Sequence, residues 1–164
     1  MGYRILFTVG TMCFAAVVAS QTPIDASAWS EDTVPPPPRF STDQLVPIDM
    51  PPYVTLRVGI DPETLFVGTD GVVRYVVVMR NSTGSEQAAY EGILCTKGEV
   101  KTYARFGAMG KWTAVEQPQW RPMTDNLGSR HAYAIAQQGG CDSRLARHRD
   151  NILQALKRRQ QGNS

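Results

Sequence analysis

The sequence predicts an α+β fold, in which a C-terminal helix packs on one face of an antiparallel β-sheet meander of four to six strands and one disulfide closes the chain. Three observations predict this fold. Short segments of alternating polarity, separated by turn residues, follow one another from Tyr53 onward. Apolar residues at helical spacing come near the C-terminus. Two cysteines remain once an N-terminal secretory signal is removed.

The first 20 residues are typical of a secretory signal peptide. A single charge, Arg4, precedes an apolar run over residues 5–19. This run is too short to span a bilayer comfortably, because spanning takes about 20 apolar residues. Cleavage after Ala19 or after Ser20 satisfies the requirement for small side chains about equally well. The alternative is an uncleaved membrane anchor.

Cys13 lies inside the apolar run and raises the alternative of a lipoprotein signal. Such a signal needs a small residue immediately before the modified cysteine, whereas Met12 occupies that position. We therefore expect Cys13 to leave with the signal, and the mature protein to be exported without lipid.

The charge of the mature chain is nearly balanced. The sequence has 17 Lys and Arg against 15 Asp and Glu, and loss of Arg4 leaves 16 against 15. This balance gives no indication of a nucleic-acid partner or of an anionic membrane surface. Six basic residues face one acid, Asp150, in residues 144–159, a pattern typical of a solvated helix face. We expect no transmembrane segment after signal cleavage.

Cys95 and Cys141 are the two cysteines of the mature chain, and they are predicted to form a disulfide. A cross-link between positions this far apart stabilises a fold by about 4 kcal/mol in the chain-entropy model. The alternative is a metal site that adds His131 and His148, but no pair has the tight spacing of a structural zinc motif. We expect no metal and no other cofactor, and interpret both histidines as ordinary surface or helix residues.

The N-terminal part of the mature chain is predicted to be extended. Residues 21–52 are rich in proline, and the run Pro35–Pro38 favours polyproline II. We interpret this segment as a stiff strap that Trp29, Phe40 and Leu45 pin to the globular domain over residues 53–160.

The first half of the globular domain predicts three strands. Residues 53–58 alternate in polarity, and residues 65–67 indicate a short second strand. The turn over residues 68–71 ends in Asp-Gly, which accepts the positive φ values that hairpins need. Residues 72–80 then predict a central strand with one apolar face. That face consists of Val73, Tyr75, Val77 and Met79.

The second half predicts further strands and a short helix. Residues 87–95 and 100–106 indicate two strands, and residues 112–120 an edge strand, since Pro118 cannot donate to a sheet ladder. Residues 128–138 favour a short helix that ends at Gly139 and Gly140.

A C-terminal helix is predicted from Ser143 to Arg159, capped by Asp142 or Ser143. We expect its apolar stripe to pack on the apolar face of the central strand, with Cys141 tying the helix start to the strand ending at Cys95. Arg149 projects into this stripe, where it either buries its stem or meets a carboxylate such as Glu91. The stripe consists of Leu145, Ile152, Leu153 and Leu156.

The strand region contains several distinctive blocks: Gly71-Val72-Val73-Arg74-Tyr75, Tyr90-Glu91-Gly92-Ile93-Leu94-Cys95 and Tyr103-Ala104, with Trp112 and Trp120. These blocks resemble the CNP-like (cryptic neisserial protein) family of proteobacterial envelope proteins. The resemblance implies a periplasmic location and a second cysteine before the last helix, here Cys141, and it carries over no activity. Leu94 departs from the family pattern, since members commonly have Arg there, and Gly139-Gly140 replaces an aromatic pair.

The sequence gives no indication of an enzyme. It contains neither the Gly-x-Ser-x-Gly nor the His-Glu-x-x-His motif, and neither histidine has a recognised catalytic context. The alternative is a hydrolase acting on envelope glycans with Glu91 and Glu99 as paired carboxylates.

A non-catalytic binding or assembly module is the function that the sequence favours, with an envelope protein or glycan as its partner. Aromatic side chains on a sheet can stack on sugars or peptides, although they can equally fill the core beneath the disulfide. The basic C-terminal helix is the second candidate surface. The candidate residues are Tyr90, Tyr103, Trp112 and Trp120 on the sheet, and Arg158 and Arg159 on the helix.

Overall fold

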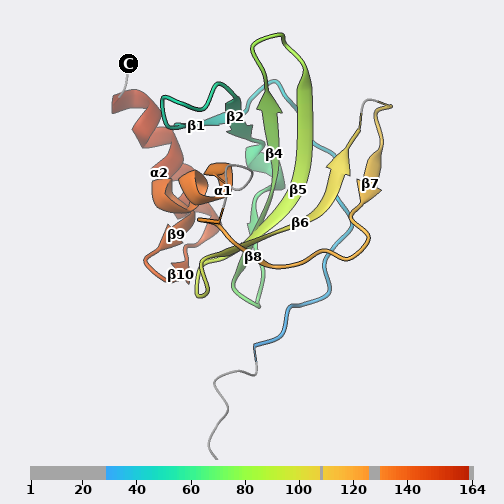
Figure 1. Cartoon of the computed structure of the whole chain (residues 1–164). Coiled ribbons are helices and arrows are strands. Elements are labelled where there is room, and N and C mark those ends of the chain that lie inside the picture. Colours follow the sequence, from blue (N-terminus) through green and yellow to red (C-terminus); the bar gives the residue numbers. More distant parts are fainter. Residues whose placement is uncertain (1–28, 108, 126–129, 163–164) are drawn as a thin grey trace, which may run out of the picture.

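A computed structural model describes residues 29–107, 109–125 and 130–162. The predicted signal peptide lies outside the described residues. Figure 1 shows an antiparallel sheet with helices α1 and α2 on one face and an extended N-terminal segment behind it. The predicted strap over residues 21–52 contains a strand of the sheet, Val46–Ile48, so from here on we call residues 29–45 the strap.

The sheet confirms the predicted antiparallel architecture. Its main path has the order β1-β2-β4-β5-β6-β7, while β3 pairs with β4 and β8 pairs with β6. The two short strands beside the path bring the sheet to eight, against the predicted four to six. The strands are β1 (Val46–Ile48), β2 (Arg57–Ile60), β3 (Phe66–Val67), β4 (Val72–Arg80), β5 (Glu86–Leu94), β6 (Glu99–Phe106), β7 (Trp112–Ala114) and β8 (Arg121–Pro122).

Strand β4 lies at the centre of the sheet, as predicted. It pairs with β5 along its whole length, from Val72 opposite Leu94 to Arg80 opposite Glu86. The hairpin between β3 and β4 also forms as predicted, and Gly71 in its turn has a φ of 78° that a side chain would disfavour. Because β4 is covered on both faces, its β-branched residues are buried almost without interruption.

The predicted strand over residues 53–58 is wrong in its position. β2 begins only at Arg57, and Tyr53 is 61% exposed. The reason lies in the preceding prolines: Pro51 accepts a hydrogen bond of 2.8 Å from the amide of Val54, which closes a turn. Proline favours such turns because its φ is preset. Tyr53 and Val54 therefore lie in the turn and not in a strand.

The predicted edge strand after residue 111 is present but short. β7 ends at Ala114, and the chain rejoins the sheet only at β8. The short helix is confirmed as α1 (Arg130–Ile135), which continues into a π-helical turn over Ala136–Gly140. Gly139 has a φ of 142°, a backbone conformation that helps to end this helical segment.

The C-terminal helix is confirmed, but its predicted start is wrong. α2 spans Arg149–Gly162, whereas β9 (Cys141–Asp142) and β10 (Leu145–Ala146) form a small hairpin ahead of it. Ser143 sits in the turn with a φ of 55°, so it does not cap the helix. Leu145 is consequently 66% exposed and does not belong to the apolar stripe.

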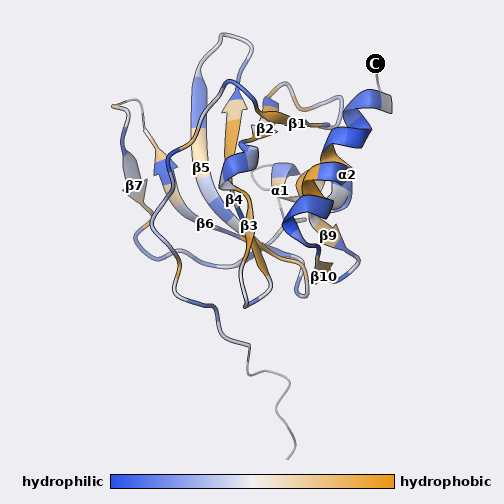
Figure 2. Ribbon diagram, turned by 180° about the vertical axis from the view of Figure 1, so that it is seen from behind, coloured by the Kyte–Doolittle hydropathy of each residue, from blue (hydrophilic) through white to orange (hydrophobic). Residues whose placement is uncertain are grey.

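The helix-facing core forms where it was predicted. The apolar face of β4 packs with Ile152 and Leu156 of α2, and Figure 2 shows the apolar side of this helix turned toward the sheet. The disulfide between Cys95 and Cys141, with Cα atoms 5.7 Å apart, joins the end of β5 to β9. The guanidinium of Arg149 donates 2.9 Å hydrogen bonds to the carbonyls of Leu65 and Pro62 and a 3.3 Å hydrogen bond to the carboxylate of Asp150, so its acidic partner is Asp150 and not Glu91.

The strap covers the opposite face of the sheet, over a second apolar cluster. As predicted, Phe40 and Leu45 pack on this cluster, and the indole N–H of Trp29 donates to the carbonyl of Asp70 at 2.8 Å. The sheet members of the cluster are Val76, Val78, Ala88, Tyr90, Tyr103 and Ala104.

Candidate functional site

A β-bulge in β6 decides which side chains face the helices. Tyr90 pairs with Ala104 but Glu91 pairs with Thr102, so Tyr103 is an extra residue in β6. Thr102 therefore faces the helices, and Tyr103 and Ala104 both face the strap. Arg105 returns to the helix face, on the same side of β6 as Val100 and Thr102.

A buried polar cluster lies between β5 and α1. The carboxylate of Glu91 is 2.7 Å from Nε2 of His131 and accepts hydrogen bonds from the hydroxyls of Thr102, at 3.1 Å, and Tyr75, at 3.3 Å. Glu91 is 3% exposed and His131 is 7% exposed. The carboxylate is thus held by three donors from three different elements.

The two members of this pair shift each other's pKa. Burial alone would raise the pKa of Glu91, but the charge of His131 and the hydrogen bonds of its neighbours hold it below its ordinary value. Burial alone would lower the pKa of His131, but the charge and hydrogen bond of Glu91 raise it, while Arg105 opposes that rise. The geometry therefore favours an ion pair, imidazolium against carboxylate.

A polar groove of about 430 Å³ lies next to this pair, on the helix face of the sheet. We call it the β6–β8 groove. Thr102 connects the two features, since it lines the groove and donates to Glu91. The groove is lined by Val100, Thr102, Arg105, Val115, Gln117, Gln119, Arg121, Pro122 and Asp125.

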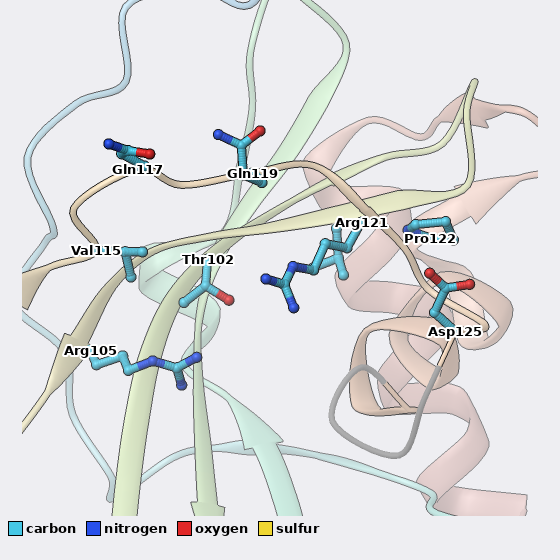
Figure 3. A pocket seen from close by; sticks show the side chains of 9 residues that line it. Thr102, Arg105, Val115, Gln117, Gln119, Arg121, Pro122 and Asp125 are labelled. Atoms are coloured by element: carbon cyan, nitrogen blue, oxygen red, sulfur yellow. The ribbon is translucent and has the colours of Figure 1, made fainter.

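Two arginines dominate the chemistry of the groove. Figure 3 shows Arg105 from β6 and Arg121 from β8 extending toward the space beside Thr102. Asp125 is the acid that lines the groove, so the lining carries two positive charges against one negative charge. Within the described part of the chain, neither guanidinium has a hydrogen-bond or ion-pair partner.

A second charged cluster fastens the strap to the opposite face. Arg74, which is 1% exposed, donates to Asp70 at 2.6 and 3.1 Å and lies 3.4 Å from Glu31 of the strap. Glu31 also accepts from Lys101 at 2.6 Å and from Tyr103 at 2.5 Å. Burial alone would raise the pKa of Asp70, but hydrogen bonds from Arg74 and from backbone amides lower it. The charges of this cluster are matched, so we interpret it as structural.

The predicted aromatic surface is largely covered. Tyr90 is 1% and Tyr103 is 7% exposed, and both pack beneath the strap and not beneath the disulfide. The prediction of a sheet surface made by these two tyrosines therefore needs correction, because the strap occupies it. Trp112 packs against Phe40 and Phe106, with ring centroids 5.6 and 5.2 Å away, and is half-buried.

Trp120 is also half-buried, and it contacts the strap rather than the groove. Its ring lies edge-on to Trp29, with centroids 5.8 Å apart, and Lys101 lies over it at 5.4 Å. Its neighbours Gln119 and Arg121 point to the groove side. Arg158 and Arg159 are exposed on α2, as predicted, and neither lines the groove.

Two alternative chemistries do not fit this arrangement. Glu99 alternates with Val100 of the helix-facing core, so it points to the opposite face of the sheet from Glu91. The two glutamates therefore cannot act as paired carboxylates. The disulfide occupies both cysteines of the alternative metal site, and His131, interpreted as an ordinary surface or helix residue, is instead a buried partner of Glu91.

The comparisons with known proteins agree with the resemblance seen in the strand motifs. The model of the family described as CNP1-like matches residues 24–157, which is most of the chain. This chain belongs to the CNP1-like family. Cryptic neisserial protein 1 of Neisseria gonorrhoeae (strain ATCC 700825 / FA 1090) is 26% identical to it over 186 residues, covering 94% of this chain and 90% of that protein. No solved structure matches the chain significantly.

This CNP1-like chain has no helix, in the part that the structure describes, with the length and apolar character needed to cross a membrane. Sequence reasoning missed the groove residues Arg105 and Arg121 and the partnership of Glu91 with His131. One signal for the latter was available, because a charged residue in the middle of an apolar strand needs a buried partner.

Proposed function

We propose that this CNP1-like protein is a non-catalytic binding module of the bacterial periplasm, and that its ligand site is the β6–β8 groove. The observation that carries the proposal is the groove itself. Its volume of about 430 Å³ falls in the range of small-ligand pockets, and it is lined by arginine, glutamine and threonine side chains. Such a lining suits a polar fragment of an envelope glycan or of an envelope protein.

Two features support a periplasmic location. The disulfide between Cys95 and Cys141 persists in an oxidising compartment and would be reduced in the cytosol. The apolar run over residues 5–19 has the form of an export signal, and small residues at its end offer a cleavage site.

Burial and hydrogen bonding of the titratable groups beside the groove support a binding function over a catalytic one. Glu91 and His131 are the acid–base pair nearest to the groove, but the carboxylate is engaged by three donors and both side chains are buried. A general base must reach a proton of the substrate. We therefore assign to this pair the role of holding Thr102 and the floor of the groove in place.

The proposal is tested by titrating ¹⁵N-labelled mature protein with defined fragments of the cell wall, including muropeptides. We expect the backbone resonances of Thr102, Arg105 and Gln119 to shift with increasing ligand. Resonances of Arg158 and Arg159, on the exposed side of α2, serve as the internal control and should stay unchanged. Shifts confined to α2 would move the function to the basic helix, and turnover of a fragment would overturn the non-catalytic assignment.

A further inference from the structure

The β6–β8 groove contains two cationic groups that the fold itself does not use. Arg105 and Arg121 are both exposed, and no carboxylate, carbonyl or hydroxyl in the described part of the chain binds either guanidinium. In contrast, the arginine of the strap cluster, Arg74, is held by two carboxylates.

The backbone brings these two side chains to one place. Arg121 pairs with Val100 at the start of β6, and Arg105 stands five residues further along the same strand. At about 3.3 Å per residue this separates the two backbones by roughly 15 Å. Both side chains extend toward Thr102, which lies between them, so both guanidinium groups line the same groove (Figure 3).

Convergence of two like charges raises the local positive potential, and the neighbouring groups do not cancel it. Glu91 is already matched by His131, and Asp125 lies at the end of the groove beyond Pro122. The effect of Arg105 reaches the buried pair, since its charge lowers the pKa of His131 against the stronger influence of Glu91. An anion between the arginines would relieve this repulsion.

We infer that the β6–β8 groove binds an oxyanion, a carboxylate or a phosphate group, between Arg105 and Arg121. The inference rests on the proposed function and names the ligand chemistry of the same site. Guanidinium is planar and presents paired N–H donors that match the two oxygens of a carboxylate or phosphate, which makes arginine the residue suited to this recognition.

Thr102 adds a second requirement for the ligand. Its hydroxyl hydrogen is directed to Glu91, so toward the groove the oxygen can only accept a hydrogen bond. A ligand that carries a hydroxyl or amide N–H close to its oxyanion therefore fits better than a bare anion. Acidic sugars and the carboxyl ends of peptides have this chemistry, and so do phosphorylated sugars.

The test uses the full mature chain and three probes: N-acetyl-alanyl-alanine, its C-terminal amide, and inorganic phosphate. We expect the free-acid peptide to shift the resonances of Thr102 and Arg105, and the amide to bind at least about tenfold more weakly, since a hydrogen bond to a charged group is lost. Comparing the peptide with phosphate separates the two sources of the oxyanion, and either one binding in the groove supports the inference.

Charge-neutral variants complete the experiment. Arg105→Gln and Arg121→Gln should each weaken oxyanion binding by about tenfold or more, because each removes one charged donor. Arg158→Gln removes the same charge from α2 and should leave affinity within about twofold at physiological salt, where exposed charges are screened beyond about 8 Å. Both groove arginines are exposed and unpaired, so these variants should keep their thermal midpoint.

Two outcomes would overturn the inference and are distinguishable from failure of the proposed function. If the neutral C-terminal amide shifts the groove resonances while neither oxyanion does, the groove remains a binding site but not one for oxyanions. If the oxyanions bind and neither groove variant weakens them, the anion site lies elsewhere. If no probe and no cell-wall fragment shifts Thr102 or Arg105, both proposals fail together.

Discussion

The carboxylate of Glu91 and Nε2 of His131 lie 2.7 Å apart, in a region that solvent barely reaches. This contact joins β5 at the centre of the sheet to α1, across 40 positions of sequence. It also fixes Thr102, whose hydroxyl donates to the same carboxylate and which lines the β6–β8 groove. The packing of α1 and the shape of the groove therefore depend on one another.

Removal of one partner of the Glu91–His131 pair should lower the free energy of unfolding. His131→Leu leaves the Glu91 carboxylate buried without a cation, and we expect the free energy of unfolding to fall by about 3–5 kcal/mol. The double variant Glu91→Gln, His131→Leu is the control, and its loss should be smaller than that of the single variant because no buried charge remains. Urea denaturation measures both, and a loss below about 1 kcal/mol for His131→Leu would contradict the ion pair.

The same pair should make stability depend on pH. The pKa of His131 is raised above its ordinary 6.5, so its contribution is complete below that pH and is lost as the pH rises through the raised value. The pKa of Glu91 is lowered below its ordinary 4.5, so its contribution is present above that pH and is lost on acidification through the lowered value. We expect the largest stabilisation between the two ordinary values.

This expectation is checked with urea titrations at about pH 5.5 and about pH 9, chosen on either side of the histidine transition. The difference in unfolding free energy between the wild type and the Glu91→Gln, His131→Leu double variant should be greater at the lower pH. An equal difference at both pH values would mean that His131 is neutral in the native state.

The disulfide should contribute to stability by a comparable amount. Cys95→Ser or Cys141→Ser should lower the unfolding free energy by about 2–5 kcal/mol, because the bridge no longer restricts the unfolded chain. Peptide mapping without reductant should recover the two cysteines as a linked pair. Two free thiols in freshly isolated protein would refute the bridge.

The strap should loosen when its charged anchor is removed. Glu31 accepts hydrogen bonds from Lys101 and Tyr103 and lies beside Arg74, so Glu31→Ala removes three contacts at once. We expect trypsin to cleave after Arg39, an exposed residue of the strap, roughly tenfold faster or more, since bonds to charged groups of about 1.5–3 kcal/mol are lost.

Asp150→Ala is the matched control for this experiment, because Asp150 is an exposed acid on the helix side of the molecule. It should leave the cleavage rate after Arg39 unchanged. Equal rates for wild type and Glu31→Ala would show that apolar packing of Phe40 and Leu45 holds the strap without help from the charges.

Local patterns predicted the features that depend on local chemistry. β4 was predictable because its nine residues are rich in valine and carry one continuous apolar face, and because a turn with Gly71 precedes it. The Cys95–Cys141 bridge was predictable because an export signal removes Cys13 and leaves two cysteines for an oxidising compartment. The strand expected over residues 53–58 failed because polarity alternation does not register the turn that Pro51 closes with Val54.

Features that depend on distant packing were not predictable in this way. His131 gives no local sign that it is buried, since its partner comes from a strand 40 residues away. The start of α2 was misplaced because Ser143 is a good helix cap in isolation, whereas here it takes a left-handed turn conformation in the hairpin β9–β10. The groove arginines carry no motif at all, and only the pairing of β6 with β8 brings them together.

The bulge at Tyr103 sets the face of the sheet on which every later residue of β6 lies. If the same residues alternated strictly from Thr102 without a bulge, Arg105 would turn toward the apolar cluster under the strap and Phe106 would turn into the groove. The charge of the groove thus depends on the backbone irregularity in β6, as well as on which residues the strand contains.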